Sequence, residues 1–232
     1  MELSIPPIFP KKIIICRIAN TSKFIDMPEF SRKAHWEHIY QTKELKDVGW
    51  YQPVPETSLH FFEVLGVPKT AKIIDVGGGD SLLVDHLLDR GYKDITVVDI
   101  SAAAIDRAKQ RLGVQAMEVN WIVSDVTQLA PTVAYDVWHD RAAFHFLTAR
   151  AEATHYVQLA HKALQPGAFL VVGTFSDQGP TKCSGMEVQQ YSVVTLEQEF
   201  SPYFKQLSSL KVDHNTPTGH TQNFVFSSFQ KH

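Results

Sequence analysis

Three consecutive glycines with acidic residues nearby are the strongest chemical signal in this sequence. Gly77, Gly78 and Gly79 follow an apolar segment at residues 72–76 and precede a pattern typical of a helix. Glycine lets a ligand approach the backbone closely, and the start of a following helix offers unpaired N–H groups. Asp99 comes about 20 residues after the first glycine, where a carboxylate accepts hydrogen bonds from a ribose diol. This combination indicates a cofactor that contains adenosine.

Two further residues bear on the identity of that cofactor. A dinucleotide-binding fingerprint has a third glycine where this sequence has Leu82, and no Tyr-x-x-x-Lys pair follows the glycines. Asp75 adds a negative charge before them, which repels a pyrophosphate and attracts an α-amino group or a sulfonium. These residues disfavour a nicotinamide dinucleotide, which stays open as an alternative.

Strand-like and helix-like segments alternate along the middle of the chain. Apolar, β-branched segments typical of buried strands lie at residues 72–76, 94–100, 119–123, 134–138 and 168–174. Apolar residues with helical spacing lie between them, at residues 81–89, 102–112 and 150–164. This alternation predicts an α/β fold with a Rossmann-like, doubly wound parallel sheet and helices on both faces. In such a sheet the glycine-rich turn lies at the carboxyl ends of the strands, where ligands bind.

The C-terminal part has a different pattern. Residues 204–212 and 223–229 both alternate as strands do, and a turn-rich stretch with Pro217 and Gly219 joins them. Because no helix fits between these two segments, we expect them to pair antiparallel.

The N-terminal part divides into an extension and two short helices. Residues 1–30 hold several prolines and a short β-branched run, so we expect an extension that is disordered or belongs to an upstream start site. One domain would then cover residues 31–232. Within it, residues 32–43 have helical spacing, and a second helix begins with Thr57 or Ser58 as its cap.

The composition favours a cytoplasmic protein without nucleic-acid or membrane partners. Hydrophobic residues make up 44% of the chain, charged residues 20%, and the net charge is -3, so no general basic character attracts nucleic acid. Cys16 and Cys183 lie far apart, which disfavours a zinc site or a disulfide framework and fits a reducing compartment. The apolar run before Cys16 is too short to cross a bilayer. We expect no metal, and the sequence leaves the oligomeric state open.

Five segments, in order along the chain, resemble the motifs of class I methyltransferases. They are residues 75–81, 97–101, 124–126, 135–141 and 164–168. The resemblance implies a seven-stranded sheet whose last strand is antiparallel, and S-adenosyl-L-methionine as the cofactor. A narrower resemblance is to bacterial methyltransferases similar to the citrate-synthase and elongation-factor lysine methyltransferases. The segments that carry it are residues 35–40, 49–53, 140–146 and 173–185.

The resemblance implies a set of cofactor contacts in the turns after the first three strands. These residues are Asp75, Gly77, Gly78, Gly79, Asp99, Ile100, Asp125 and Val126. Asp75 would hold the amino group of the methionine part, and Asp99 would bind the ribose. Ile100, Asp125 and Val126 would contact the adenine. For Asp125, a helix cap at a strand end is the open alternative.

Aromatic residues near the N-terminus are candidates for a lid over the cofactor. Trp36, Tyr40, Trp50 and Tyr51 would place aromatic faces, which attract a cationic sulfonium, over its methionine end. The alternative is a hydrophobic flap that packs on the sheet whatever is bound.

Three polar residues are candidates for the side that receives the methyl group. Asp140 would face the crevice at the end of the fourth strand and orient an amine or contact the cofactor, and His145 would accept a proton. Cys183 follows the fifth strand and could lie near the acceptor. The alternatives are an ion pair or helix cap for Asp140, a packed core histidine for His145, and a plain thiol for Cys183.

The expected activity is transfer of a methyl group from the sulfonium to an acceptor nucleophile. A protein lysine or another amine is one acceptor class, and a small thiol, carboxylate or metalloid is the other. A nicotinamide-dependent oxidoreductase and a binding module without catalysis remain as alternatives.

Overall fold

The strands and helices follow one another in the order that the apolar pattern predicts. The computed structural model describes residues 30–232, so the extension expected at residues 1–30 lies, up to residue 29, outside the described part. Ser31–His232 form one unit. Its helices are α1 (Arg32–Thr42), η1 (Leu45–Asp47), α2 (Glu56–Val64), α3 (Leu83–Asp89), α4 (Ala102–Leu112), η2 (Gly113–Glu118), η3 (Val126–Gln128), η4 (Phe144–Phe146), α5 (Arg150–Ala163) and α6 (Val193–Phe200). Its strands are β1 (Lys72–Val76), β2 (Asp94–Asp99), β3 (Val119–Val123), β4 (Tyr135–Arg141), β5 (Leu164–Phe175), β6 (Lys182–Cys183), β7 (Met186–Glu187), β8 (Phe204–Asn215) and β9 (Thr221–Lys231).

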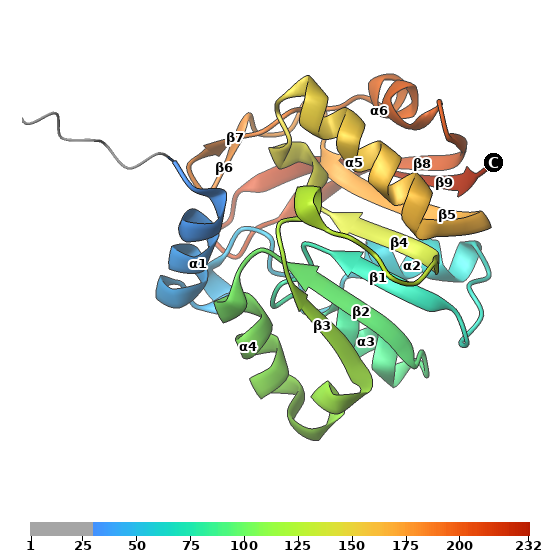
Figure 1. Ribbon diagram of the computed structural model, residues 1–232. Coiled ribbons are helices and arrows are strands. Elements are labelled where there is room, and N and C mark those ends of the chain that lie inside the picture. Colours follow the sequence, from blue (N-terminus) through green and yellow to red (C-terminus); the bar gives the residue numbers. More distant parts are fainter. Residues whose placement is uncertain (1–29) are drawn as a thin grey trace, which may run out of the picture. The chain divides into compact units, whose positions relative to one another are not determined.

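Seven strands form the central sheet in the order β3-β2-β1-β4-β5-β9-β8 (Figure 1). Strands β1 to β5 pair in parallel, and β9 runs antiparallel to both of its neighbours, β5 and β8. The seven strands and the antiparallel last strand are therefore confirmed. A separate hairpin of β6 and β7, which the sequence analysis does not anticipate, lies in the connection after β5.

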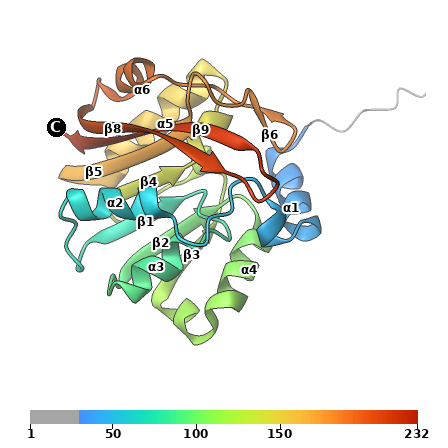
Figure 2. The same cartoon turned by 180° about the vertical axis from the view of Figure 1, so that it is seen from behind.

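Helices cover both faces of this sheet because alternate residues of each strand point to opposite sides. On one side, Ile73 and Val137 pack in a core with residues of α2, α3 and α4. On the other side, Ile74 and Trp138 pack with residues of α5 and α6. Accordingly, α5 lies in front of the sheet in Figure 1, whereas α2 and α3 lie in front of it in Figure 2. The expectation of helices on both faces is confirmed.

Two element boundaries differ from expectation in ways that affect the site. Strand β4 continues to Arg141, three residues beyond the expected end, because polar side chains at its end find buried partners on other elements. Helix α2 begins at Glu56 after Pro55, so neither Thr57 nor Ser58 is its cap. Ser58 instead lies inside the helix, buried against the sheet.

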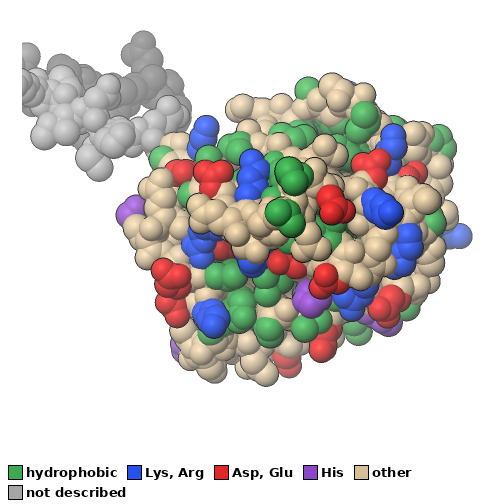
Figure 3. All heavy atoms as spheres, turned by 90° about the horizontal axis from the view of Figure 1, so that it is seen from below, with side chains coloured by type: hydrophobic (Ala, Val, Ile, Leu, Met, Phe, Trp, Pro, Cys, Tyr) green, Lys and Arg blue, Asp and Glu red, His purple; other side chains and the backbone are tan. Residues whose placement is uncertain are grey.

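Charges of both signs are interspersed on the face drawn in Figure 3, with Lys and Arg side chains among Asp and Glu. Within residues 30–232, no helix is long and apolar enough to cross a membrane.

Candidate functional site

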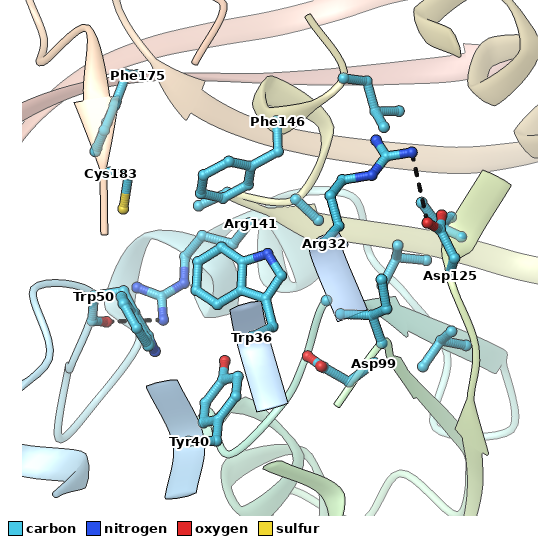
Figure 4. A pocket seen from close by; sticks show the side chains of 18 of the residues that line it. Arg32, Trp36, Tyr40, Trp50, Asp99, Asp125, Arg141, Phe146, Phe175 and Cys183 are labelled. Carbon is cyan, nitrogen blue, oxygen red and sulfur yellow. Dashed lines mark hydrogen bonds and ion pairs between the residues drawn. The ribbon is translucent and has the colours of Figure 1, made fainter. Parts of the chain in front are cut away.

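A pocket lies at the carboxyl ends of the parallel strands, where the segments after β1, β2, β3 and β4 meet (Figure 4). Residues of α1, the side chain of Trp50 and residues of β5, β6 and β9 complete its lining. The space between its lining atoms, including the part that is open to solvent, is about 890 Å³. This is the position at which doubly wound sheets bind their ligands.

The glycine loop lies close to side chains of α1, of the turn after β4 and of β1 itself. A Cβ atom on Gly77 would lie 2.6 Å from the Cβ of Ala143, and one on Gly78 would lie 2.5 Å from Oδ2 of Asp75. A Cβ on Gly79 would lie 2.7 Å from the Tyr40 hydroxyl. Gly77 and Gly79 also have φ angles of +66° and +48°, which glycine adopts readily. Of the three glycines, Gly77 lines the pocket, and the other two let the surrounding groups approach.

Asp99 lies at the end of β2, and its carboxylate lines the pocket although only 5% of the residue is exposed. Its Oδ1 accepts a hydrogen bond of 2.8 Å from the Ser101 N–H. Burial raises the pKa of Asp99 to about 7, a value that includes a lowering by the Ser101 N–H and a smaller increase from the carboxylates of Asp80 and Asp75. An acceptor of this kind at the pocket wall suits the hydroxyl groups of a ribose.

Ile100, Asp125 and Val126 line the other part of the same wall. Oδ1 of Asp125 accepts hydrogen bonds from the N–H and the hydroxyl of Thr127, so Asp125 caps η3 as well as lining the pocket. The helix cap that the sequence leaves open for Asp125 therefore occurs, and contact with the adenine stays a prediction. Its Oδ2 lies 3.6 Å from Arg32 of α1, across the pocket.

Helix α1 presents one face to the pocket along its length. Arg32, Trp36 and Tyr40 lie four residues apart, a spacing that places them on the same side of a helix, and all three line the pocket. The Trp36 ring lies 5.0 Å from the ring of Phe146 and 5.8 Å from that of Trp50, measured between centroids. The three expected lid residues Trp36, Tyr40 and Trp50 therefore meet at the pocket, whereas Tyr51 is not among its lining residues.

Polar contacts hold α1 in this position. Glu37 accepts hydrogen bonds from the Ser101 hydroxyl at 2.7 Å and from the Ala103 N–H at 3.2 Å, at the start of α4. Arg107 of α4 donates to the carbonyl of Tyr40 at 2.9 Å and lies 3.1 Å from Oδ2 of Asp80. Arg107 therefore connects the end of α1 with the glycine loop.

Asp75 does not line the pocket, although the sequence places it at the cofactor. Its side chain points to the side of the sheet covered by α2, where Oδ1 lies 2.7 Å from Nδ1 of His139. Nε2 of His139 lies 2.8 Å from the Ser58 hydroxyl. Since all three residues are at most 3% exposed, they form a buried polar chain beside the loop.

The expectation that Asp140 faces the pocket needs correction. Because β4 extends through this residue, its side chain points into the core beneath α5 and is fully buried. Oδ2 accepts a hydrogen bond of 2.5 Å from the Tyr156 hydroxyl, and Oδ1 accepts from the N–H groups of Ala143 and Phe144. Burial raises its pKa to about 6. These contacts shape the turn after β4 and leave the side chain outside the pocket lining.

His145 is likewise buried away from the pocket, as a packed core histidine. Its ring lies 4.5 Å from that of Phe146 and 4.7 Å from that of Phe175, and Nδ1 accepts a hydrogen bond from the Phe175 N–H. Burial lowers its pKa to about 3, so the ring is neutral at physiological pH. Cys183 does line the pocket, and burial raises the pKa of its thiol to about 11.

Residues 73–167 match a family model described as a methyltransferase domain. The matched region runs from β1 into β5 and includes the glycine loop, Asp99 and Asp125. This match, together with the similarities below, supports a class I S-adenosylmethionine-dependent methyltransferase. S-adenosylmethionine is the cofactor of this class, which sets aside the nicotinamide alternative.

The chain is similar to methyltransferases whose names indicate different acceptors. The chain is 29% identical over 148 residues to the eEF1A lysine and N-terminal methyltransferase of Mus musculus, which covers 62% of this chain and 21% of that protein. It is 23% identical over 211 residues to the EEF1A lysine methyltransferase 2 of Danio rerio, covering 83% of each. The crystal structure of the N-methyltransferase NodS from Bradyrhizobium japonicum in complex with S-adenosyl-L-homocysteine has the same fold, with a TM-score of 0.66 at 15% identity over 87% of this chain and 99% of that one. The chain thus spans about a fifth of the length of the first of these relatives.

Several residues that line the pocket are not predicted from the sequence. Arg141, the residue after Asp140 in the sequence, lines the pocket. A predicted fourth strand three residues longer would have ended at Arg141 and placed it at the pocket. Phe146, Phe175 and Phe224 form an aromatic part of the lining. The partners of these residues lie on distant elements, so spacing along the chain carries no signal for them.

Proposed function

We propose that this chain transfers the methyl group of S-adenosylmethionine to an amine, with the side chain of a protein lysine as the leading acceptor. The observation that carries the proposal is the shared pocket of the glycine loop, Asp99 and Asp125. Carboxylates after two neighbouring strands suit the ribose and the adenine of one adenosine group. The lysine acceptor is supported by the similarity to lysine methyltransferases.

The pocket fits the cofactor in charge as well as in position. Asp99 and Asp125 are its acidic lining residues, at the end proposed for the adenosine group. Ile100 and Val126 are apolar neighbours that would pack on the adenine, and Gly77 leaves the backbone open beside the methionine part. Trp36, Tyr40 and Trp50 would place aromatic faces near the positive sulfur.

The aromatic part of the pocket supports an amine acceptor. Phe146, Phe175 and Phe224 would pack along the aliphatic part of a lysine and exclude water from its amino group. Burial disfavours the charged form of an amine, so it lowers the pKa and favours the nucleophilic neutral form. With Asp140 and His145 buried elsewhere, alignment and desolvation would take the place of a general base. The cofactor supplies an activated methyl group, and the proton of the acceptor nitrogen goes to solvent.

A small-molecule acceptor is the second candidate function. Trp36 packs against both Trp50 and Phe146 at the pocket, which favours a ligand that can be enclosed. As part of the proposal we place the activity in the cytoplasm, because two cysteines without a disulfide framework fit a reducing compartment.

Labelling with cofactor that carries a tritiated methyl group tests the proposed function. The purified chain is added to cell lysate, which is then separated into protein and small-molecule fractions. We expect label in the protein fraction and recovery of methylated lysine after hydrolysis. Label in the small-molecule fraction alone would support the second candidate. No label in either fraction, from a protein that binds S-adenosylhomocysteine, would identify a binding module without catalysis.

A further inference from the structure

The guanidinium group of Arg141 lies in the pocket and donates hydrogen bonds to neutral groups. Arg141 is partly buried and lines the pocket after β4. Its Nη1 donates to Oε1 of Gln52 at 2.7 Å, and its Nη2 donates to the carbonyl of Trp50 at 3.1 Å. None of the ion pairs formed within residues 30–232 includes Arg141. Burial lowers the pKa of Arg141, and the charge of the nearby Asp75 partly offsets this effect. A partly desolvated cation whose hydrogen-bond partners are neutral is well suited to an anionic ligand.

A chain of hydrogen bonds fixes the direction of this guanidinium. Gln52 accepts from Arg141 and donates from Nε2 to Nδ1 of His214, at 3.2 Å. Nε2 of His214 then donates to the carbonyl of Gly49 at 2.8 Å. In this series of hydrogen bonds every donor faces an acceptor. Residues of β8 and of the loop before α2 therefore hold the Arg141 side chain in place. A side chain that is already held in position binds a ligand with little loss of conformational entropy.

Arg141 also lies at the end of the pocket where the amino-acid part of the cofactor would be. Arg32 is beside Asp125, at the end proposed for the adenine. Figure 4 shows Arg141 away from that pair, between Trp50 and Trp36. A cofactor with its adenine at Asp125 and its ribose at Asp99 would extend its methionine part toward Arg141. That part carries an α-carboxylate, which requires a cationic partner.

We propose that Arg141 binds the α-carboxylate of the methionine part of the cofactor. The planar guanidinium forms two parallel hydrogen bonds with a carboxylate, and such charge-assisted pairs are stronger than neutral ones. This inference rests on the proposed function, since it requires the cofactor to occupy the pocket in the direction described above.

Calorimetric titration with two ligands tests this assignment. The ligands are S-adenosylhomocysteine and its decarboxylated analogue S-adenosyl-3-thiopropylamine, which differ only in the carboxylate. We expect the unaltered protein to bind the first ligand on the order of 10- to 100-fold more tightly than the second. In Arg141→Met this preference disappears, because affinity for S-adenosylhomocysteine falls while affinity for the analogue stays the same. Arg141→Lys, which keeps the charge but not the planar group, should keep part of the preference.

Arg32→Met is the matched control, because Arg32 is a cation that lines the same pocket at its other end. It should leave the ratio between the two affinities unchanged. A preference for the carboxylate that survives in Arg141→Met would overturn the proposal, as would an equal loss of affinity for both ligands. If the unaltered protein binds neither ligand, the proposed function itself fails, which is a different result from an unchanged preference in the variant.

Discussion

Nδ1 of His139 lies 2.7 Å from Oδ1 of Asp75, across the neighbouring strands β4 and β1. A carboxylate can only accept, so the Nδ1–H group donates to it, and the Ser58 hydroxyl is placed to donate to Nε2 at 2.8 Å. This chain connects α2 with the two strands that end at the glycine loop and at Arg141. It satisfies a buried carboxylate that would otherwise carry a large desolvation cost.

Replacing His139 should therefore destabilise the fold. We expect His139→Leu to lower the free energy of unfolding by about 3 kcal/mol, because it leaves the Asp75 carboxylate buried without its partner. Ser58→Ala should cost about 1 kcal/mol, since one neutral hydrogen bond is lost. Urea unfolding measures both values. The control is His60→Leu, an exposed position on the same helix as Ser58. Equal effects of the two histidine substitutions would show that the buried chain does not contribute.

Asp99 should contribute strongly to cofactor affinity. We expect Asp99→Ala to weaken binding of S-adenosylhomocysteine by about 1–3 kcal/mol, because hydrogen bonds to the ribose hydroxyls are lost. Isothermal titration calorimetry gives the value, and Asp89→Ala, an exposed position at the end of α3, serves as the control. An affinity unchanged by Asp99→Ala would exclude the ribose role.

The pKa of Asp99 implies that cofactor affinity depends on pH. Burial raises this pKa to about 7 in the free protein, and the ionised carboxylate is the form that accepts hydrogen bonds from both ribose hydroxyls. Binding therefore favours the ionised form, and affinity should be full above pH 7 and should fall as the pH is lowered through 7 toward 5. Asp99→Asn should remove most of this dependence. The neighbouring Asp80 also has a raised pKa, so a profile that is equally steep in Asp99→Asn would assign the effect to Asp80 instead.

Gly77 should tolerate a side chain poorly for two separable reasons. A Cβ at this position would lie 2.6 Å from the Cβ of Ala143, and the φ angle of +66° disfavours any L side chain. Gly167 has a φ angle of +77° with nothing within 4 Å of its Cβ position, so Gly167→Ala isolates the conformational cost, about 1 kcal/mol. We expect Gly77→Ala to lower the free energy of unfolding by more than this, as measured by urea unfolding. It should also weaken cofactor binding. Equal losses in the two variants would mean that the loop can move away from Ala143.

The residues of the site that could be predicted are those whose position depends on the neighbouring sequence alone. The glycine loop, Asp99 and Ile100 follow apolar segments that can only be buried strands, so their place at the pocket follows from the fold class. Residues 139–141 are polar and do not look like a strand interior. They complete β4 because their partners come from α2, β1, α5 and the loop before α2, which are distant in sequence. The face of the sheet to which each of these three side chains points could therefore not be predicted.

The same long-range packing explains why the buried position of His145 could not be predicted from the sequence. A histidine after strand four suggests acid–base chemistry from the sequence alone, whereas its position between Phe146 and Phe175 depends on how β5 pairs with β4. The hairpin of β6 and β7, which brings Cys183 to the pocket, depends on tertiary contacts in the same way.

The most direct test of the central claim is calorimetric titration of the purified chain with S-adenosylhomocysteine and, in parallel, with NAD. We predict binding of S-adenosylhomocysteine at a single site, with no measurable binding of NAD at the same concentrations. Tight binding of NAD together with no binding of S-adenosylhomocysteine would show that the pocket is not a site for S-adenosylmethionine.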